Sequence, residues 1–278
     1  MDFNRSLFLN VREKKTPYLA AHRGVCGANI PCNTLTAFKI AVDQGAEIVE
    51  IDVSKSKDGK FYVFHPGMEN VFLKTGKYIS EMDGAEVDSI TIQNSDEAPT
   101  HYRIPKLSEV LAFLKDKCYI NVDKFWTDIK GISEEIRKAG VEKQVIVKTY
   151  PDEKCYDEIE KYAPDFAFMP MVWHKDDVTQ QLLKRNINYV GLEALFDSLD
   201  DEIASSGYLE SMHKNNLLVW ANSIIYNEKD VISAGLTDDV SLEKGGDYGW
   251  GKLRKIGFDI VQTDWLLPAK LYFQNISK

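Results

Sequence analysis

IVEIDVSKSKDGKFYVFH, residues 48–65, contains two runs of apolar and β-branched residues with too few residues between them for a helix. The dipeptide Asp58-Gly59 between the runs is favoured in the two-residue turn of a β-hairpin. The stretch therefore predicts an antiparallel hairpin. If Asp58-Gly59 is the centre of the turn, the numbers of paired residues sum to 117, so Asp52 faces His65 and Glu50 lies on the same face. We expect two carboxylates and an imidazole to lie close together.

Apolar runs typical of strands alternate along the chain with segments of helical spacing. The strand candidates are Tyr18–Ala21, Ile48–Val53, Phe61–Phe64, Tyr119–Val122, Val145–Val147, Phe166–Met169, Tyr189–Leu192, Leu217–Ala221 and Ile260–Thr263. Helical spacing is clearest from Leu107, Ile129 and Leu35, the last with Asn33 or Thr34 placed to cap it. Alternating strands and helices pair in parallel through right-handed crossovers. Because the hairpin accounts for one extra strand, the pattern predicts an α/β fold, a distorted (β/α)8 TIM barrel.

Two longer segments interrupt this alternation. Residues 67–104 and 223–250 carry little periodicity, and long segments of this kind are often functional loops of a compact domain. The chain shows neither an internal repeat nor a linker, and α/β barrels of about 250 residues are common. We therefore expect one domain that spans residues 1–278.

Composition and charge exclude several classes of partner. The chain carries 43 acidic and 34 basic side chains, and its net charge of -9 disfavours nucleic acid as a partner. No stretch approaches the roughly 18 apolar residues of a membrane helix, so an integral membrane segment is not expected. The N-terminus lacks the apolar core of a signal peptide, and the four cysteines are expected to be reduced thiols. We predict a cytoplasmic protein whose oligomeric state the sequence leaves open.

Carboxylates at strand spacing are the first candidates for chemistry. Glu50 and Asp52 lie on one face of an otherwise apolar strand, where two charges are costly unless a partner neutralises them. A divalent cation with oxygen ligands, Mg2+ or Ca2+, would do so. Asp123 follows the strand Tyr119–Val122 and is a natural third ligand. A solvated strand face or a salt bridge is the alternative.

Two histidines and an arginine follow strands of the same part of the chain. His22 ends the first strand and His65 ends the hairpin, and histidine exchanges protons near neutral pH. Two such residues at one site are suited to act as general acid and general base; a structural role is the alternative for each. Arg23 offers a planar donor pair that matches phosphate oxygens, unless it forms only a surface ion pair.

Lys148 and Trp220 also follow or end apolar strands, where the active sites of barrels are built. Lys148 could donate to a phosphate oxygen, and Trp220 could form an apolar wall. For both residues a purely structural role is equally compatible with the sequence.

Together these motifs resemble those of one family, the glycerophosphodiester phosphodiesterases. The stretch AHRGVCGANIPCNTLTAFKIAVDQGAEIVEIDVSKSKDGKFYVFHP (Ala21–Pro66) is similar to the family signature of HRG, a P-E-N-T helix start, E-x-D-V, a T-K-D-G turn and a second histidine. Three further segments are similar to family motifs in the same order: Ile104–Asp123, Leu217–Asn222 and Gly257–Trp265. The resemblance extends over about residues 18–273.

The resemblance implies a distorted TIM barrel with a carboxylate-bound Mg2+ or Ca2+ and a role in lipid metabolism. It implies hydrolysis of glycerophosphodiesters to glycerol 3-phosphate and an alcohol, with a cyclic phosphate formed on the way. Carried over by position, the roles are these: His22 and His65 are the acid/base pair, Glu50, Asp52 and Asp123 hold the metal, and Arg23 holds the phosphate.

The sequence departs from the family pattern at several positions. Cys32 replaces the glutamate of P-E-N-T, and Asp123 is one methylene shorter than the family's glutamate. Phe125 stands where the family has a lysine; Lys124 is expected to point to the opposite face, so that Lys148 could supply the missing cation. Two alternatives stay open: a diesterase that releases a cyclic phosphate, and a catalytically inactive barrel that binds a phosphorylated ligand, which Cys32 and Phe125 favour.

Overall fold

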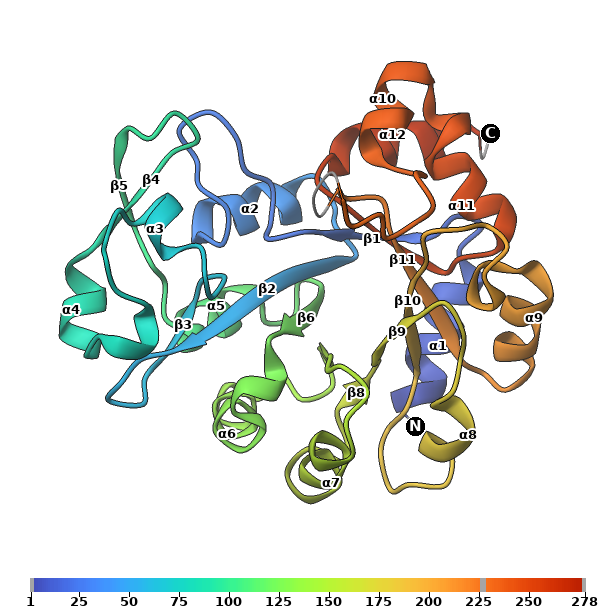
Figure 1. Cartoon of the computed structure of the whole chain (residues 1–278), viewed down its shortest axis with the longest axis horizontal. Helices are drawn as coiled ribbons and strands as arrows, with labels where there is room; N and C mark the ends of the chain where they lie inside the picture. Colours follow the sequence, from blue (N-terminus) through green and yellow to red (C-terminus); the bar gives the residue numbers. More distant parts are fainter. Residues whose placement is uncertain (1–2, 226–228, 277–278) are drawn as a thin grey trace.

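The computed structural model, which describes residues 3–225 and 229–276, contains a parallel sheet that curls on itself (Figure 1). Its strand order among these residues is β8-β7-β6-β2-β1-β12-β11-β10-β9, with β3 paired to β2. The strands are β1 (Tyr18–Ala21), β2 (Ile48–Lys55), β3 (Phe61–Val63), β6 (Tyr119–Asp123), β7 (Val145–Val147), β8 (Ala167–Phe168), β9 (Met171–Trp173), β10 (Gly191–Leu195), β11 (Leu218–Asn222) and β12 (Ile260–Thr263). Because β8 and β9 follow each other in the chain, the two ends of the sheet meet.

The barrel is closed by a strand that is interrupted at Pro170. Before this proline, the amide of Val190 donates to the carbonyl of Phe168 (3.1 Å); after it, the amide of Met171 donates to the carbonyl of Thr149 (3.0 Å). Proline has no amide hydrogen, so the ladder is broken at this residue. β8 and β9 thus act as one barrel strand, and the prediction of a distorted (β/α)8 barrel is confirmed.

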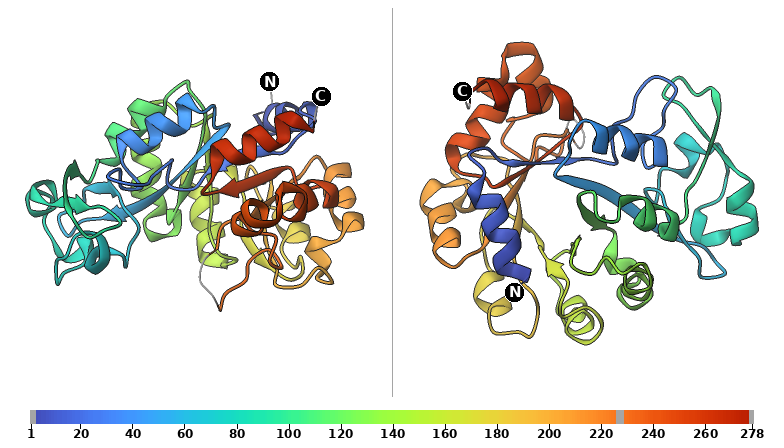
Figure 2. Two further views of the ribbon diagram at one scale, coloured as in Figure 1. Left: turned by 90° about the horizontal axis from the view of Figure 1, so that it is seen from above. Right: turned by 180° about the vertical axis from the view of Figure 1, so that it is seen from behind.

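Helices cover the outside of the barrel and one of its ends (Figure 2). The helices of the main body are α1 (Phe3–Glu13), α2 (Leu35–Asp43), α5 (Leu107–Leu114), α6 (Ile129–Ala139), α7 (Glu153–Tyr162), α8 (Thr179–Leu182), α9 (Ser206–Lys214), α10 (Asp238–Lys244), α11 (Trp250–Ile256) and α12 (Leu266–Asn275). Thr34 caps α2 as predicted, because its hydroxyl accepts from the amide of Ala37 (3.3 Å). Leu7 and Val11 of α1 pack into the interior cluster of the barrel, so α1 closes the end where the strands begin.

The alternation of side chains along each strand separates an apolar layer from a polar one. In β2, Val49 and Ile51 belong to the apolar cluster between strands and helices, whereas Glu50 and Asp52 alternate with them and are buried on the other face. In β6, Ile120 and Val122 likewise belong to the apolar cluster between the strands and the helices. The polar side chains therefore point into the barrel.

The hairpin of β2 and β3 is present, but its predicted register is wrong. Val53 pairs with Val63, so paired residue numbers sum to 116, and the amide of Phe64 donates to the carbonyl of Asp52 (2.9 Å). The loop has three residues with Gly59 at φ 86°, a geometry that places the glycine in the left-handed region. The carboxylate of Asp58 accepts from the hydroxyl of Ser56 (2.6 Å), which stabilises this longer turn.

Residues 67–104 are a folded extension rather than an irregular loop. The extension contains α3 (Glu69–Phe72), a 3-10 turn (Ile79–Glu81), α4 (Gly84–Ser89) and the antiparallel pair β4 (Thr91–Gln93) and β5 (Pro99–Arg103). It projects from one side of the barrel in every view (Figures 1 and 2). Its own apolar cluster includes Tyr62 of β3, so it is continuous with the hairpin. That the whole chain is one domain stays a prediction.

The second long segment, residues 223–250, is tied to the barrel by Asp238 at the start of α10. One carboxylate oxygen of Asp238 accepts from Ser223, Trp250 and Thr263, each at 2.7 Å, and the other accepts from the amide of Asp264 (2.8 Å). Residues 226–228 of the predicted loop lie outside the described residues. Asp238 therefore fixes the carboxyl ends of β11 and β12.

Candidate active site

A cavity of about 180 Å³ opens where the barrel strands end. Its lining includes His22, Arg23, Glu50, His65 and Asp123. The volume is below the roughly 300–1,000 Å³ of sites for drug-sized ligands, so the cavity suits a small substrate. A wider hollow of about 860 Å³ lies at the opposite end of the barrel, and the residues that line it include no histidine.

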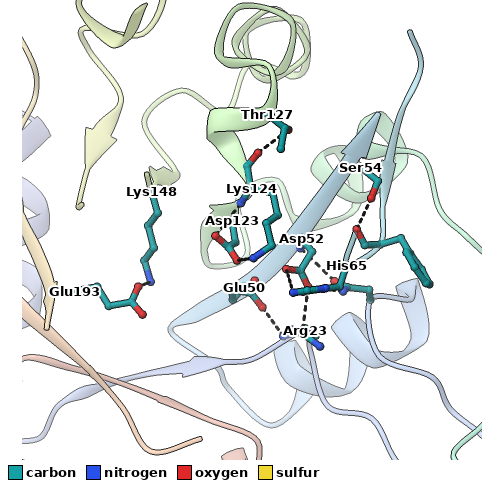
Figure 3. Close-up of polar contacts among 12 residues, drawn as sticks. Arg23, Glu50, Asp52, Ser54, His65, Asp123, Lys124, Thr127, Lys148 and Glu193 are labelled. Carbon is teal, nitrogen blue, oxygen red and sulfur yellow. Dashed lines mark hydrogen bonds and ion pairs between the residues drawn. The ribbon is translucent and has the colours of Figure 1, made fainter. Parts of the chain in front are cut away.

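Three carboxylates meet on the wall formed by β2 and β6. Glu50, Asp52 and Asp123 each offer an oxygen, and these oxygens lie within 4.8 Å of one another. One oxygen of Asp52 accepts from Asn33 (2.9 Å) and lies 2.9 Å from Nε of Arg23, while Oδ1 accepts no hydrogen bond from the described residues. Figure 3 shows this cluster with the side chain of Arg23 against Asp52. A buried acceptor without a donor is the kind of atom that a cation satisfies.

The electrostatics of the cluster also fit a cation. Burial, reinforced by the neighbouring charge of Asp52, raises the pKa of Glu50 to about 8. The backbone amide of Arg23 donates to Oε2 of Glu50 (2.8 Å). A divalent ion held by oxygen ligands would stabilise the ionised forms of all three groups, so the residues present fit Mg2+ or Ca2+.

Lys124 points into the cavity, contrary to the sequence prediction. Its ammonium lies 2.9 Å from Oδ2 of Asp123. The prediction assumed that the alternation of β6 continues, but Lys124 has φ 60° and ψ 20°, which turns its side chain back toward Asp123 (Figure 3). Phe125 is instead fully buried in the apolar core. The ammonium of Lys124 therefore lies beside the carboxylates, although Phe125 stands at the position where the family has a lysine.

His22 is held by a carboxylate that the sequence analysis did not single out. Its Nδ1 lies 2.8 Å from Oδ1 of Asp264, and the backbone of Asp264 is in turn fixed by Asp238. Burial lowers the pKa of His22, but the hydrogen bond and the charge of Asp264 outweigh it, and the net pKa is raised. The bond to Asp264 leaves the other ring nitrogen to exchange a proton with a ligand.

His65 lies on the other side of the carboxylates in a different environment. Its Nε2 is 3.9 Å from Oδ1 of Asp52, and its Nδ1 has no hydrogen-bond partner among the described residues. Burial lowers the pKa of His65, and the positive charges of Arg23 and Lys124 lower it further against the opposing effect of Asp52. The two histidines thus have pKa values that are displaced in opposite directions.

Lys148 lines the cavity, whereas Trp220 lies beneath it. The ammonium of Lys148 forms a buried ion pair with Glu193, so it already has an anionic partner (Figure 3). Trp220 does not form a wall of the cavity: it is fully buried in the barrel interior, and Lys148 lies 3.4 Å from its ring centre. Inward-facing positions near the middle of a barrel strand are filled by core side chains, which explains the difference.

Comparison with known proteins identifies the family. The model of the "Glycerophosphoryl diester phosphodiesterase family" matches residues 22–221, which include all eight predicted site residues. The chain belongs to this family. A glycerophosphodiester phosphodiesterase of Caldanaerobacter subterraneus is 30% identical over 152 residues, 52% of this chain and 62% of that protein. The chain thus spans less than two thirds of this relative's length.

Solved structures confirm the fold. A glycerophosphoryl diester phosphodiesterase from Parabacteroides distasonis superposes with a TM-score of 0.77 at 16% identity, covering 98% of this chain and 92% of the other. An Oleispira antarctica phosphodiesterase, solved in complex with the product sn-glycerol-3-phosphate, gives a TM-score of 0.63 at 20% identity, covering 95% of this chain and 98% of the other.

Within residues 3–225 and 229–276, each helix is too short or too polar to span a bilayer.

Proposed function

We propose that the protein is a metal-dependent phosphodiesterase that hydrolyses glycerophosphodiesters, or a related small phosphodiester, to glycerol 3-phosphate and an alcohol. The observation that carries the proposal is the placement of two histidines around a group of three carboxylates, two of which line the same small cavity as the histidines. A binding site has no need for two groups that transfer protons. The product bound to the Oleispira phosphodiesterase supports the same substrate class.

The charged groups divide into a cation site and a phosphate site. Glu50, Asp52 and Asp123 would hold Mg2+ or Ca2+, which when bound offsets the charge that develops on the phosphate oxygens. Arg23 and Lys124 line the cavity beside these carboxylates and can donate to phosphate oxygens. This assignment gives Lys124 the part that the sequence analysis left to Lys148, which we place at the edge of the phosphate site.

We assign the proton transfers from the opposite directions in which the two histidine pKa values are displaced. His65, with its lowered pKa, is the neutral base that takes the proton from the neighbouring glycerol hydroxyl, whose oxygen then bonds to phosphorus. The bond to the second alcohol breaks, and His22, with its raised pKa, protonates the departing oxygen. Water then opens the resulting cyclic phosphate with the two roles reversed.

Phosphorus NMR of glycerophosphocholine hydrolysis tests the proposal. With Mg2+ or Ca2+ we expect glycerol 3-phosphate as the final product, and with excess EDTA we expect no turnover. Full activity in EDTA would contradict the metal-dependent mechanism. A cyclic phosphate that persists would favour the diesterase that stops at this species, and binding without turnover would favour the inactive barrel.

The proposal includes the partners and location expected from the sequence. We propose a small-molecule phosphodiester as the partner and not nucleic acid, in a cytoplasmic protein. The four cysteines are free thiols in the structure, which is compatible with a reducing compartment.

A further inference from the structure

The layer of barrel residues beneath the cavity is polar, although such layers are usually filled by branched apolar side chains. Five of its residues line the cavity, and each lies in, or directly follows, a different strand of the barrel. We call them the polar floor: Asn121, Lys148, Glu193, Asn222 and Gln262. Their exposed fractions lie between 0% and 6%, so their polar groups are removed from bulk water. Burial of this kind is costly without a function or a complete set of partners.

One half of the polar floor is a neutral and fixed network. Glu193 pairs with Lys148 through one oxygen and accepts from Nδ2 of Asn222 (2.5 Å) through the other. Oδ1 of Asn222 accepts from the indole of Trp220 (3.1 Å), which also supports the ammonium of Lys148 from below. The charge of Lys148 is therefore neutralised in place. This half of the floor is suited to a neutral polar ligand rather than to a second anion.

The other half presents acceptors without donors. Oδ1 of Asn121 and Oε1 of Gln262 accept no hydrogen bond from the described residues. The amide nitrogen of Asn121 donates to the carbonyl of Ile146 (3.1 Å), which holds the side chain in its orientation. An acceptor buried without a donor destabilises the protein, so whatever fills the cavity must bring hydrogen-bond donors to these two oxygens.

We propose that the polar floor binds the hydroxyl groups of the alcohol that leaves, and that the protein therefore prefers diesters of polyols. This inference rests on the proposed function and names the substrate class of the same site. A hydroxyl group can donate to Gln262 or Asn121 and accept from Lys148, whereas a trimethylammonium group can do neither. The apolar residues Met171 and Leu195 also line the cavity. Because they offer no hydrogen bonds, hydroxyl groups of a ligand would find partners at the polar floor instead.

A substrate panel combined with one variant pair tests this. The substrates are glycerophosphoglycerol and glycerophosphoinositol, whose second alcohols are polyols, and glycerophosphocholine, whose second alcohol is cationic. Gln262→Leu removes one acceptor of the floor without a large change of volume. Gln44→Leu is the matched control, because Gln44 also has a buried Oε1 without a partner but lies at the end of α2, where it does not line the cavity.

We expect the wild-type kcat/KM to be higher for the polyol diesters, and Gln262→Leu to lower it about tenfold for them, mainly through KM. The same variant lowers kcat/KM for glycerophosphocholine less than it does for the polyol diesters, and Gln44→Leu leaves all three values unchanged. Thermal unfolding without substrate shows that Gln262→Leu is folded, with a melting temperature equal to or above that of the wild type.

The possible failures are distinguishable. Hydrolysis of all three diesters with no preference for polyols, or equal losses for all three in Gln262→Leu, would overturn the inference while leaving the proposed function intact. Hydrolysis of none of them would overturn the proposed function itself.

Discussion

Asp264→Asn tests how the barrel prepares His22 for proton transfer. The two groups are 2.8 Å apart, with His22 16% exposed and Asp264 46% exposed. A hydrogen bond to a charged partner contributes about 1.5–3 kcal/mol, and the exposure of Asp264 favours the lower end because solvent screens the pair. Loss of the charge removes this stabilisation of the protonated imidazole, so the pKa of His22 falls.

The sign of the effect on activity follows from the role of His22 as the acid. A raised pKa keeps the imidazole protonated to higher pH, and kcat/KM falls as the pH rises through that value. In Asp264→Asn the alkaline limb of the pH profile therefore moves to lower pH. The assay is kcat/KM against pH with a glycerophosphodiester, together with NMR titration of the His22 ring protons.

A second pair of the chain provides the control. The pKa of His174 is raised by its hydrogen bond to Asp201, and this pair does not line the cavity. Asp201→Asn should lower the pKa of His174 and leave the pH profile of catalysis unchanged. An alkaline limb that stays in place in Asp264→Asn, or moves to higher pH, would refute the reasoning for His22.

Two further predictions concern stability. Gly191 has φ 145°, and a Cβ added there would lie 1.9 Å from the carbonyl oxygen of Leu218, so Gly191→Ala should destabilise the fold by at least about 3 kcal/mol in urea unfolding. A Cβ added at Gly207 in α9 meets none of the described residues within 4 Å, so Gly207→Ala should stabilise the fold by about 0.5–1 kcal/mol. Similar effects of the two changes would contradict the close approach of β10 and β11. Mg2+ or Ca2+ at 100 times its dissociation constant should add about 2.7 kcal/mol to the unfolding free energy of the wild type. The same ion should add less to the unfolding free energy of Asp123→Asn. A wild-type melting temperature that neither ion raises would count against the carboxylates as a metal site.

The barrel could be predicted because apolar periodicity reports directly on strands and helices. β1, β7 and β12 have the predicted bounds, and the buried alternation of β2 places Glu50 and Asp52 on one face as expected. The break at Pro170 was not predicted, because Met171–Trp173 is too short to stand out as a strand. Local pattern thus gives regular elements and misses interruptions of the ladder.

The site residues could be predicted where ionisable groups stand at the ends of strands. They could not be predicted where the backbone conformation of a single residue determines the direction of its side chain. The left-handed conformation of Lys124 reverses its side chain, and no period in the sequence reports it. The hairpin register differs by one residue from the predicted one, with a longer turn that the hydrogen bond between Ser56 and Asp58 stabilises, yet His65 still lies near Asp52. Glu193 and Gln262 stand as polar residues within apolar strands, a signal that was present but acquires meaning only when the barrel brings the strands together.

Release of glycerol 3-phosphate from a glycerophosphodiester, measured for the wild type, His22→Ala and His65→Ala, tests the central claim most directly. If the two histidines transfer protons in this cavity, the wild type forms the product in the presence of Mg2+ or Ca2+, and each variant is slower by about 10²- to 10⁴-fold while its melting temperature is retained. Wild-type rates in both folded variants would contradict the account.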